Sequence, residues 1–195
     1  MIKIDCFDIS ILTDDQYARL YQQATQYRKE QANRYLRQED KIRCVCADAL
    51  LRNALQRDDY AVGFGAQGKP YLTDVDGFYY NLSHSGRWVV IAYGPSELGV
   101  DVQQFRTQGT EGIARRFFTV EEQAHLEHQP DDFFRIWTEK ESYLKYLGVG
   151  LTKALNSFSV LEDLRVNFFT EQLEDACLTL CTKEKEYSLR ILESI

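Results

Sequence analysis

The chain has 195 residues, of which 44% are hydrophobic and 13% aromatic, and its formal net charge at pH 7 is −7. This composition is typical of a folded protein with a hydrophobic core and excludes a disordered chain. The acidic balance argues against a general nucleic-acid-binding protein.

Membrane and secretory signals are not evident in the sequence. No apolar run reaches the length of a membrane span, and residues 1–5 do not open a secretory signal, so we expect a cytoplasmic protein. The five cysteines are odd in number and lack the spacing of a zinc site. Reduced, buried thiols are therefore expected, together with no binding to nucleic acid or membrane.

The first half of the chain alternates between strand and helix patterns. Helices are expected at 14–27 and, as the longest, at 29–56, while the glycines and proline of residues 63–70 predict a loop. Strands are expected at residues 2–9, 71–72, 78–82, 88–93 and 98–102.

The second half begins with a loop at 105–112 and a short helix at 113–118. Thr119 and Glu122 have the spacing of a capping box, so a further helix should start at Thr119. A helix from Pro130 should extend through residue 147. Later strands are expected at residues 158–160, 166–169, 177–181 and 187–192, which makes the class α+β.

Residues 99–103, Gly-Val-Asp-Val-Gln, form the first segment with chemical meaning. Side chains two apart share a face of a strand, so Val100 and Val102 should face the core and Gly99, Asp101 and Gln103 the opposite side. Gly99 would leave that surface open for a ligand, and the oxygens of Asp101 and Gln103 suit Mg²⁺. An edge strand with a polar outer face is the alternative.

The predicted helix at 133–147 is the second such segment. It places Lys140 near the middle of its apolar face, where an unpaired lysine is rare, and Glu141 and Lys145 together on the flank. An exposed Glu–Lys pair would contribute only about 0.3–0.5 kcal/mol. In the functional alternative, Glu141 binds metal or takes a proton, while Lys140 and Lys145 hold phosphate oxygens.

Two further features suit an anionic ligand. Ser83 and His84 lie between two predicted strands, where they and turn amides can contact a phosphate. A serine hydrolase is disfavoured because sequence neighbours rarely converge as nucleophile and base, and no nucleophile elbow is present. Residues 28–57 carry eight basic side chains against four acidic ones. On charge count alone, a solvated helix face is favoured over a ligand site. The basic residues are Arg28, Lys29, Arg34, Arg37, Lys41, Arg43, Arg52 and Arg57.

Together, these segments resemble the 4′-phosphopantetheinyl transferases, specifically the large, monomeric Sfp-like class. The family patterns match, in order, residues 68–71 (Gly-Lys-Pro-Tyr), 81–85 (Asn-Leu-Ser-His-Ser), 99–102 and 137–145 (Trp-Thr-Glu-Lys-Glu-Ser-Tyr-Leu-Lys). Residues 115–118 and 155–160 resemble further family segments. Each match is weak alone, but their order and spacing are highly specific.

The resemblance implies two similar α/β halves related by a pseudo-twofold axis, residues 1–95 and 96–195, with coenzyme A in the cleft between them. It also implies transfer of phosphopantetheine from coenzyme A to a serine of an apo acyl or peptidyl carrier protein. The other product would be 3′,5′-adenosine bisphosphate. A monomer is the family default, and secondary metabolism is the favoured pathway class.

The resemblance also assigns roles to residues. Asp101, Gln103 and Glu141 would hold Mg²⁺, with Mn²⁺ as the alternative, and Glu141 or a metal-bound water would deprotonate the carrier serine. Lys140 and Lys145 would neutralise the pyrophosphate and the leaving group. The remaining coenzyme A contacts would come from Arg28, Arg43, Lys69, Pro70, Ser83 and His84.

Three positions depart from the family pattern. Gln103 stands where many relatives have Glu, which leaves open whether the amide or a water ligates the metal. Gln31 replaces a frequent Lys and Cys44 a common Thr, so the details of the 3′-phosphate contacts stay open.

Two other functions use the same residues. A metal-dependent phosphodiesterase would cleave coenzyme A without a carrier, and a non-catalytic module would bind coenzyme A or carrier without turnover. For the transferase, residues 105–118 are expected to form the carrier-docking surface, with Arg106, Arg115 and Arg116 facing acidic carrier helices.

Overall fold

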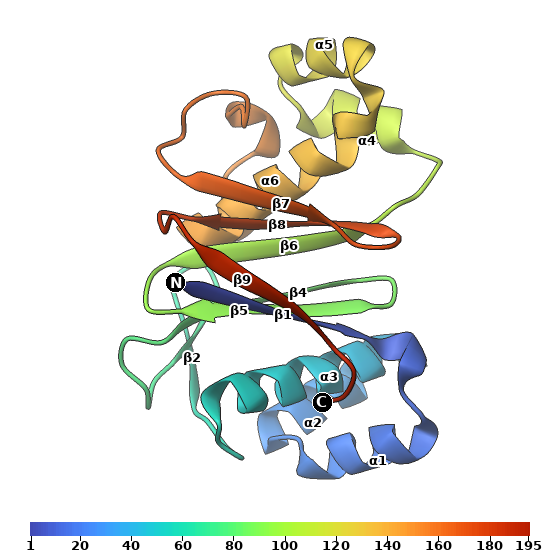
Figure 1. Ribbon diagram of the computed structural model, residues 1–195, viewed down its shortest axis with the longest axis vertical. Helices are drawn as coiled ribbons and strands as arrows, with labels where there is room; N and C mark the ends of the chain where they lie inside the picture. Colours follow the sequence, from blue (N-terminus) through green and yellow to red (C-terminus); the bar gives the residue numbers. More distant parts are fainter.

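The computed structural model describes residues 1–195 except the side chain of Leu151. Two β-sheets form its centre (Figure 1). The first has the order β4-β5-β1-β9, in which β9 pairs parallel with β1 and the other neighbours are antiparallel. Its strands are β1 (Ile2–Asp8), β4 (Tyr79–Ser85), β5 (Trp88–Gly94) and β9 (Tyr187–Leu192).

The second sheet is antiparallel throughout, with the order β6-β8-β7. Its strands are β6 (Leu98–Gln104), β7 (Asn167–Gln172) and β8 (Ala176–Thr182). A separate hairpin joins β2 (Val62–Phe64) to β3 (Pro70–Leu72). The predicted loop at 63–70 is therefore wrong at its ends, which pair as strands, and is confirmed only for the central turn.

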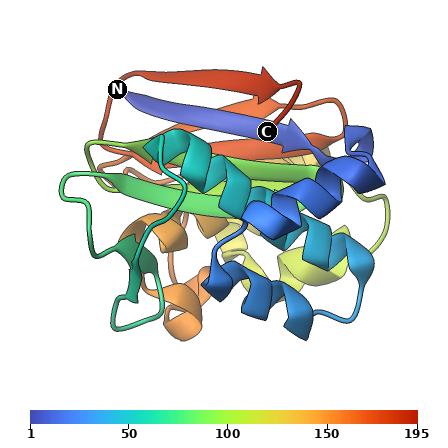
Figure 2. The same ribbon diagram turned by 90° about the horizontal axis from the view of Figure 1, so that it is seen from below.

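Helices cover the outer face of each sheet. The first group lies on the four-stranded sheet, as the view from below shows (Figure 2): α1 (Asp14–Gln23), α2 (Gln26–Arg34) and α3 (Gln38–Leu55). The second group lies beyond the three-stranded sheet: α4 (Thr110–Phe117), α5 (Val120–His128) and α6 (Phe133–Leu147). Short 3₁₀ turns occupy Ile9–Ile11, Pro130–Asp132, Gly150–Thr152 and Leu155–Ser157. The expected α+β class is confirmed.

The two sheets pack face to face because alternate side chains of their strands are apolar on one side. Val90 and Ala92 of β5 face the second sheet, whereas Val89 and Ile91 face the helices of the first group. Val100 and Val102 of β6 join the core between the sheets, as predicted. These shared contacts make one continuous core across both halves.

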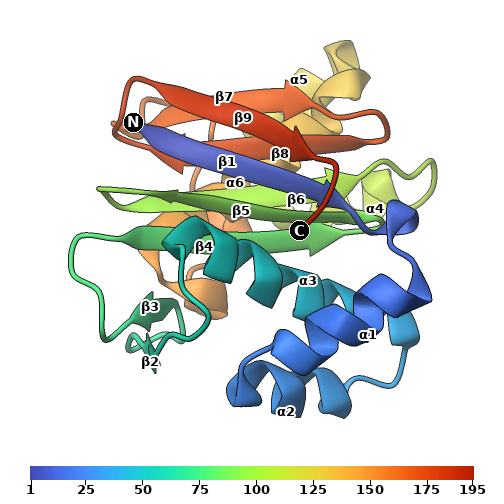
Figure 3. The ribbon, with the colours of Figure 1, turned by 60° about the horizontal axis from the view of Figure 1, so that its bottom comes forward.

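The boundary expected at residues 95–96 falls in the turn between β5 and β6, where the chain passes from the first sheet to the second. The C-terminal strand β9 then returns and runs beside β1 (Figure 3). The two sheets therefore do not coincide with the two halves of the sequence. The pseudo-twofold relation between the halves stays a prediction.

Two further predicted elements differ from the structure. The helix at 29–56 is two helices, because Thr25 caps α2 and the chain leaves the helical path at residues 35–37. The strand expected at 158–160 does not form. The carbonyl of Phe158 accepts a hydrogen bond from Lys140, and the amide of Val160 donates to Glu122, so side chains replace a strand partner. No helix among the described residues combines the length and apolarity needed to cross a bilayer.

Candidate active site

Besides packing face to face, the two sheets adjoin along β4 and β6, which are end strands of their sheets. Polar side chains at alternate positions of β4 accept hydrogen bonds from alternate backbone amides of β6. These side chains take the place of the neighbouring strand with which the amides at the edge of β6 would otherwise pair. We call this the β4–β6 seam, and its bonds are Val100 N to Asn81 Oδ1 (2.9 Å), Val102 N to Ser83 Oγ (3.2 Å) and Gln104 N to Ser85 Oγ (3.0 Å).

Lys145 of α6 and Asp101 of β6 form an ion pair at this seam. The Lys145 Nζ lies 2.7 Å from Asp101 Oδ1 and also donates to the Ser83 hydroxyl and the Val100 carbonyl, at 2.9 and 3.0 Å. Ser83 Oγ in turn donates to Asp101 Oδ1 at 2.9 Å. Asp101 is only 7% exposed, so these partners fix its carboxylate and orient the lysine.

The expected role of Ser83 as a phosphate contact stays a prediction, and its hydroxyl has partners within the protein. Its hydroxyl donates one hydrogen bond, to Asp101, and accepts two, from Lys145 and the Val102 amide. A hydroxyl has one donor and two acceptor sites, so its capacity is filled. Ser83 holds the ion pair in place.

Gly99 is the reason that α6 lies so close to β6. A Cβ at residue 99 would lie 2.1 Å from the Ser142 carbonyl oxygen and 2.3 Å from the Tyr146 amide nitrogen. The expectation that Gly99 leaves a surface open for a ligand is therefore wrong, because the backbone of α6 fills that space. The close approach is what brings Lys145 to Asp101.

Glu141 stands one turn before Lys145 on α6 and is half-buried. Partial burial, and then the negative charge of Asp101, raises the pKa of Glu141 above its ordinary value, while Lys145 opposes this effect. Among the described residues, no hydrogen bond occupies its carboxylate. A carboxylate with a raised pKa beside a cation is suited to accept a proton.

Glu141 and Lys145 line a cavity of about 250 Å³. Its other wall comes from the first half of the chain, through Lys69, Pro70 and Asn81. The cavity thus joins side chains sixty or more positions apart in the sequence. It brings the predicted proton acceptor to the predicted coenzyme A contacts of the first half.

The oxygen donors of the site fit a hard divalent cation such as Mg²⁺. Asp101 and Glu141 are close enough for the charge of one to raise the pKa of the other, a repulsion that a cation would relieve. Within the described part of the chain, no three His, Cys, Asp or Glu side chains gather as a metal cluster. An ion here would need neutral oxygens besides these two carboxylates, and Gln103 supplies one on the same strand face as Asp101.

His84 lies on β4 between two residues of the seam, so it points to the other side of the strand. The residue is exposed overall, but desolvation by the protein atoms around its ring, and then the charges of Arg43 and Lys145, lower the pKa of His84. Arg43 donates to the Gly86 carbonyl at 2.7 Å and to Asp40 at 2.6 Å. The charge of Arg43 thus acts on His84, and the phosphate contacts expected of these two residues stay a prediction.

Arg28 is buried and already has protein partners. Its guanidinium donates to Gln31 at 2.8 Å and to the Tyr60 hydroxyl at 3.4 Å. Tyr60 then donates at 2.6 Å to Asp48, which is fully buried. Asp48 forms its ion pair with Arg52, at 2.9 Å, and is linked to Arg28 through the Tyr60 hydroxyl. The basic residue was visible in the sequence, but this link was not, because Asp48 and Tyr60 lie 20 and 32 positions away.

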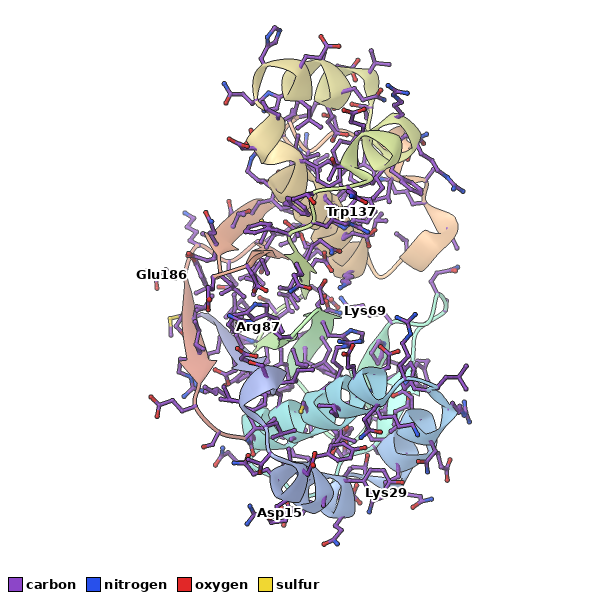
Figure 4. All side chains as sticks on the ribbon, turned by 90° about the vertical axis from the view of Figure 1, so that its right-hand side faces the viewer. Asp15, Lys29, Lys69, Arg87, Trp137 and Glu186 are labelled. Atoms are coloured by element: carbon purple, nitrogen blue, oxygen red, sulfur yellow. The ribbon has the colours of Figure 1, made fainter. Side chains whose placement is uncertain are left out.

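Lys69 connects the β2–β3 hairpin to the second half of the chain, at the level where the halves meet (Figure 4). Its ammonium donates to Glu97 at 2.9 Å and to the carbonyls of Leu98 and Tyr146 at 3.1 and 3.3 Å. Lys69 and Pro70 line both the 250 Å³ cavity and a neighbouring one of about 420 Å³. Lys69 and Pro70 therefore lie between two neighbouring cavities.

Lys140 does not reach this site, which corrects the expectation that it binds phosphate. Its side chain is fully buried on the far side of α6, 2.7 Å from both carboxylate oxygens of Glu122 and 2.6 Å from the Phe158 carbonyl. Its place on the apolar face is explained by this pair. Glu122, identified in the sequence only as a capping residue, also keeps that role by accepting from the Thr119 amide.

Comparison with known proteins shows which family this chain resembles in sequence. Residues 97–192 match the 4′-phosphopantetheinyl transferase superfamily. A 4′-phosphopantetheinyl transferase of Bacillus subtilis is 37% identical over 144 residues, which cover 68% of this chain and 64% of that protein. The 4′-phosphopantetheinyl transferase Sfp of Bacillus subtilis strain 168 is 35% identical over 144 residues, with the same 68% and 64% coverage.

The chain thus spans somewhat less than two thirds of the length of these two relatives. A third relative is covered more completely: the 4′-phosphopantetheinyl transferase ffp of Bacillus subtilis is 34% identical over 169 residues, which are 80% of this chain and 75% of that protein. At this identity and coverage, the chain belongs to the 4′-phosphopantetheinyl transferase superfamily.

Proposed function

We propose that this chain transfers 4′-phosphopantetheine from coenzyme A to a serine of an apo acyl or peptidyl carrier protein. The observation that carries the proposal is the cavity in which Glu141 and Lys145 of α6 face Lys69 and Pro70 of the first half, beside Asp101. The relatives named above support the same reaction class.

In the proposed reaction, the serine oxygen of the carrier attacks the phosphorus that bears the pantetheine arm. The bond from that phosphorus to the bridging pyrophosphate oxygen breaks, and 3′,5′-adenosine bisphosphate leaves. Glu141 accepts the serine proton, for which its raised pKa suits it. Lys145, oriented by Asp101 and Ser83, faces the charge that develops on the phosphate oxygens.

Asp101 and Glu141, with Gln103 as a neutral donor, would hold Mg²⁺ or Mn²⁺. When bound, the ion would neutralise part of the pyrophosphate charge and orient it. Arg43 and His84 are proposed to contact a phosphate group of coenzyme A. Arg28 is proposed to do the same through the N–H groups that do not donate to Gln31 or Tyr60. Lys69 and Pro70 are proposed to border its adenine.

The carrier is proposed to dock on residues 105–118. Arg106, Arg115 and Arg116 are exposed there, and Phe105 is 38% exposed while its ring packs edge-on against Phe134. Exposed arginines beside an aromatic surface suit a partner with acidic helices. A monomer is part of this proposal because both walls of the cavity come from one chain. Cytoplasmic location and a role in secondary metabolism are proposed with it.

Intact-mass spectrometry tests the function. A panel of apo carriers would be incubated with the protein, coenzyme A and Mg²⁺. A phosphopantetheine mass gain on a carrier is expected. Cleavage of coenzyme A without mass gain would instead favour the phosphodiesterase. Binding of coenzyme A by calorimetry with neither reaction on any carrier would favour the non-catalytic module.

A further inference from the structure

The side chain of Gln103, at the end of β6, is held by two oxygen atoms. Its Nε2 donates to Ser85 Oγ at 3.1 Å and to the backbone carbonyl of Gln104 at 3.2 Å. Ser85 Oγ also accepts from the Gln104 amide at 3.0 Å, so it belongs to the β4–β6 seam. One serine thus fixes both the backbone and the side chain at the end of β6.

These contacts determine which way the Gln103 amide points. A backbone carbonyl can only accept a hydrogen bond, so the NH₂ group and not the oxygen must face Gln104. The oxygen Oε1 then lies at the opposite edge of the planar amide group, away from Ser85 Oγ and the Gln104 carbonyl. A glutamate at this position would instead place a carboxylate oxygen against the Gln104 carbonyl, two acceptors with no proton between them. The local structure is therefore built for an amide.

Ser85 is itself held firmly. It ends β4, directly before the turn at Gly86, whose carbonyl accepts from Arg43 at 2.7 Å. The side chain of Gln104 covers Gly86 so closely that a Cβ there would lie 2.1 Å from Gln104 Oε1. The nitrogen of the same amide, Gln104 Nε2, donates to Asp175 at 2.7 Å. Ser85 thus stands on a turn that is braced from two sides.

From this arrangement we propose that Ser85 positions the Gln103 amide so that Oε1 is a neutral third protein ligand for the divalent cation held by Asp101 and Glu141. Gln103 and Asp101 share a face of β6, which places the amide oxygen and the carboxylate on the same side. The inference rests on the proposed function only for the presence of the ion. Ser85 is a positioning residue, which acts through Gln103.

Calorimetric titration of the whole protein with Mn²⁺, alone and with coenzyme A present, tests the inference. Gln103→Ala and Ser85→Ala should each weaken Mn²⁺ binding about tenfold, as is typical when a ligand or the group that orients it is lost. The double variant should bind Mn²⁺ no more weakly than Gln103→Ala, since Ser85 acts only through Gln103. Ser85→Thr keeps the hydroxyl and should restore binding.

Ser96→Ala is the matched control, because Ser96 is also half-buried, flanks the other end of β6 and donates to Glu184 at 2.8 Å. It should leave Mn²⁺ affinity unchanged. Additive losses in the double variant, or binding by Ser85→Thr as weak as that of Ser85→Ala, would reject the positioning role. Wild-type affinity in Gln103→Ala would reject the ligand itself, and this outcome decides the matter even where Ser85→Ala does not fold.

This test is independent of the test of the proposed function, because mass spectrometry measures carrier modification and calorimetry measures Mn²⁺ binding. Transfer by the wild type together with unchanged Mn²⁺ affinity in Gln103→Ala would reject this inference and leave the transferase standing. Loss of Mn²⁺ affinity in the two variants would support the ligand even if no carrier in the panel were modified.

Discussion

The ammonium of Lys140 lies 2.7 Å from both carboxylate oxygens of Glu122, and neither side chain has any exposure to solvent. Thr119, Phe158 and Val160 complete the hydrogen bonding around this pair. It ties the start of α5 and the segment after residue 157 to the side of α6 opposite the cavity. Lys140, inside the motif of residues 137–145, is therefore structural, while its neighbour Glu141 faces the cavity.

Lys140→Met should lower the free energy of unfolding by about 3–5 kcal/mol, because it leaves Glu122 buried without its cation. Chemical denaturation measures this loss. Glu122→Gln combined with Lys140→Met should recover part of it, since the unpaired charge is gone. Coenzyme A affinity of the folded Lys140→Met protein should stay at the wild-type value. A large loss of affinity with unchanged stability would restore Lys140 to the phosphate site.

Glu141→Gln should abolish transfer while sparing coenzyme A binding, because an amide cannot accept the serine proton but keeps the size of the side chain. Asp101→Ala should weaken both, since it releases Lys145 and removes a proposed ligand of the ion. Single-turnover mass analysis and calorimetry with coenzyme A separate the two effects. Near-normal transfer by Glu141→Gln would assign the proton to another group.

The acidic limb of the pH–rate profile should report Glu141, whose pKa is raised by partial burial and by Asp101. A base must be ionised to act, so the rate should fall as the pH falls through this raised pKa. Asp101→Asn removes a negative neighbour and should shift the limb to lower pH. Lys145→Met removes a positive neighbour and should shift it to higher pH. Both variants should be slow, so their pH–rate profiles are measured at high enzyme concentration. An acidic limb at the wild-type pH in both variants would contradict the assignment of the limb to Glu141.

Gly99→Ala should destabilise the protein by about 1–3 kcal/mol or more, because its Cβ would overlap the backbone of α6. The same displacement should separate Lys145 from Asp101 and reduce transfer. Gly112 in α4 offers a matched control, since a Cβ there meets nothing within 4 Å. Gly112→Ala should raise stability by about 0.5–1 kcal/mol. Thermal unfolding compares the two, and equal effects would contradict the packing argument.

Charge reversal at Arg115 and Arg116 should raise the KM for the carrier about tenfold with little change in the KM for coenzyme A, because like charges would face an acidic carrier helix. Both arginines are exposed on α4, and Arg116 lies over the ring of Phe117. Lys185→Glu, an exposed charge reversal between β8 and β9, is the control. An unchanged carrier KM in the α4 variants would move the docking surface elsewhere.

Local sequence patterns determined much of the secondary structure and indicated the candidate site. The alternation of Val100, Asp101 and Val102 predicted a strand with one apolar face, and the spacing of Thr119 and Glu122 predicted a capping box, because both depend on neighbours a few positions apart. The helix carrying Glu141 and Lys145 followed from its apolar period. The order of short motifs along the chain indicated the family, which the comparisons confirm.

Tertiary structure alone decided which of these side chains meet. Lys140 and Lys145 are equivalent charges in the sequence, but they lie on different sides of α6: one is enclosed by Glu122, and the other reaches Asp101. From the sequence, Gly99 is expected to leave space for a ligand, but in the structure α6 packs on it. The seam of Asn81, Ser83 and Ser85 with β6 joins segments nearly twenty residues apart, and no local period records such a contact. Hydrogen bonding between distant segments is set by how the two sheets pack, and so the sequence indicated the candidate residues while the fold assigned their partners.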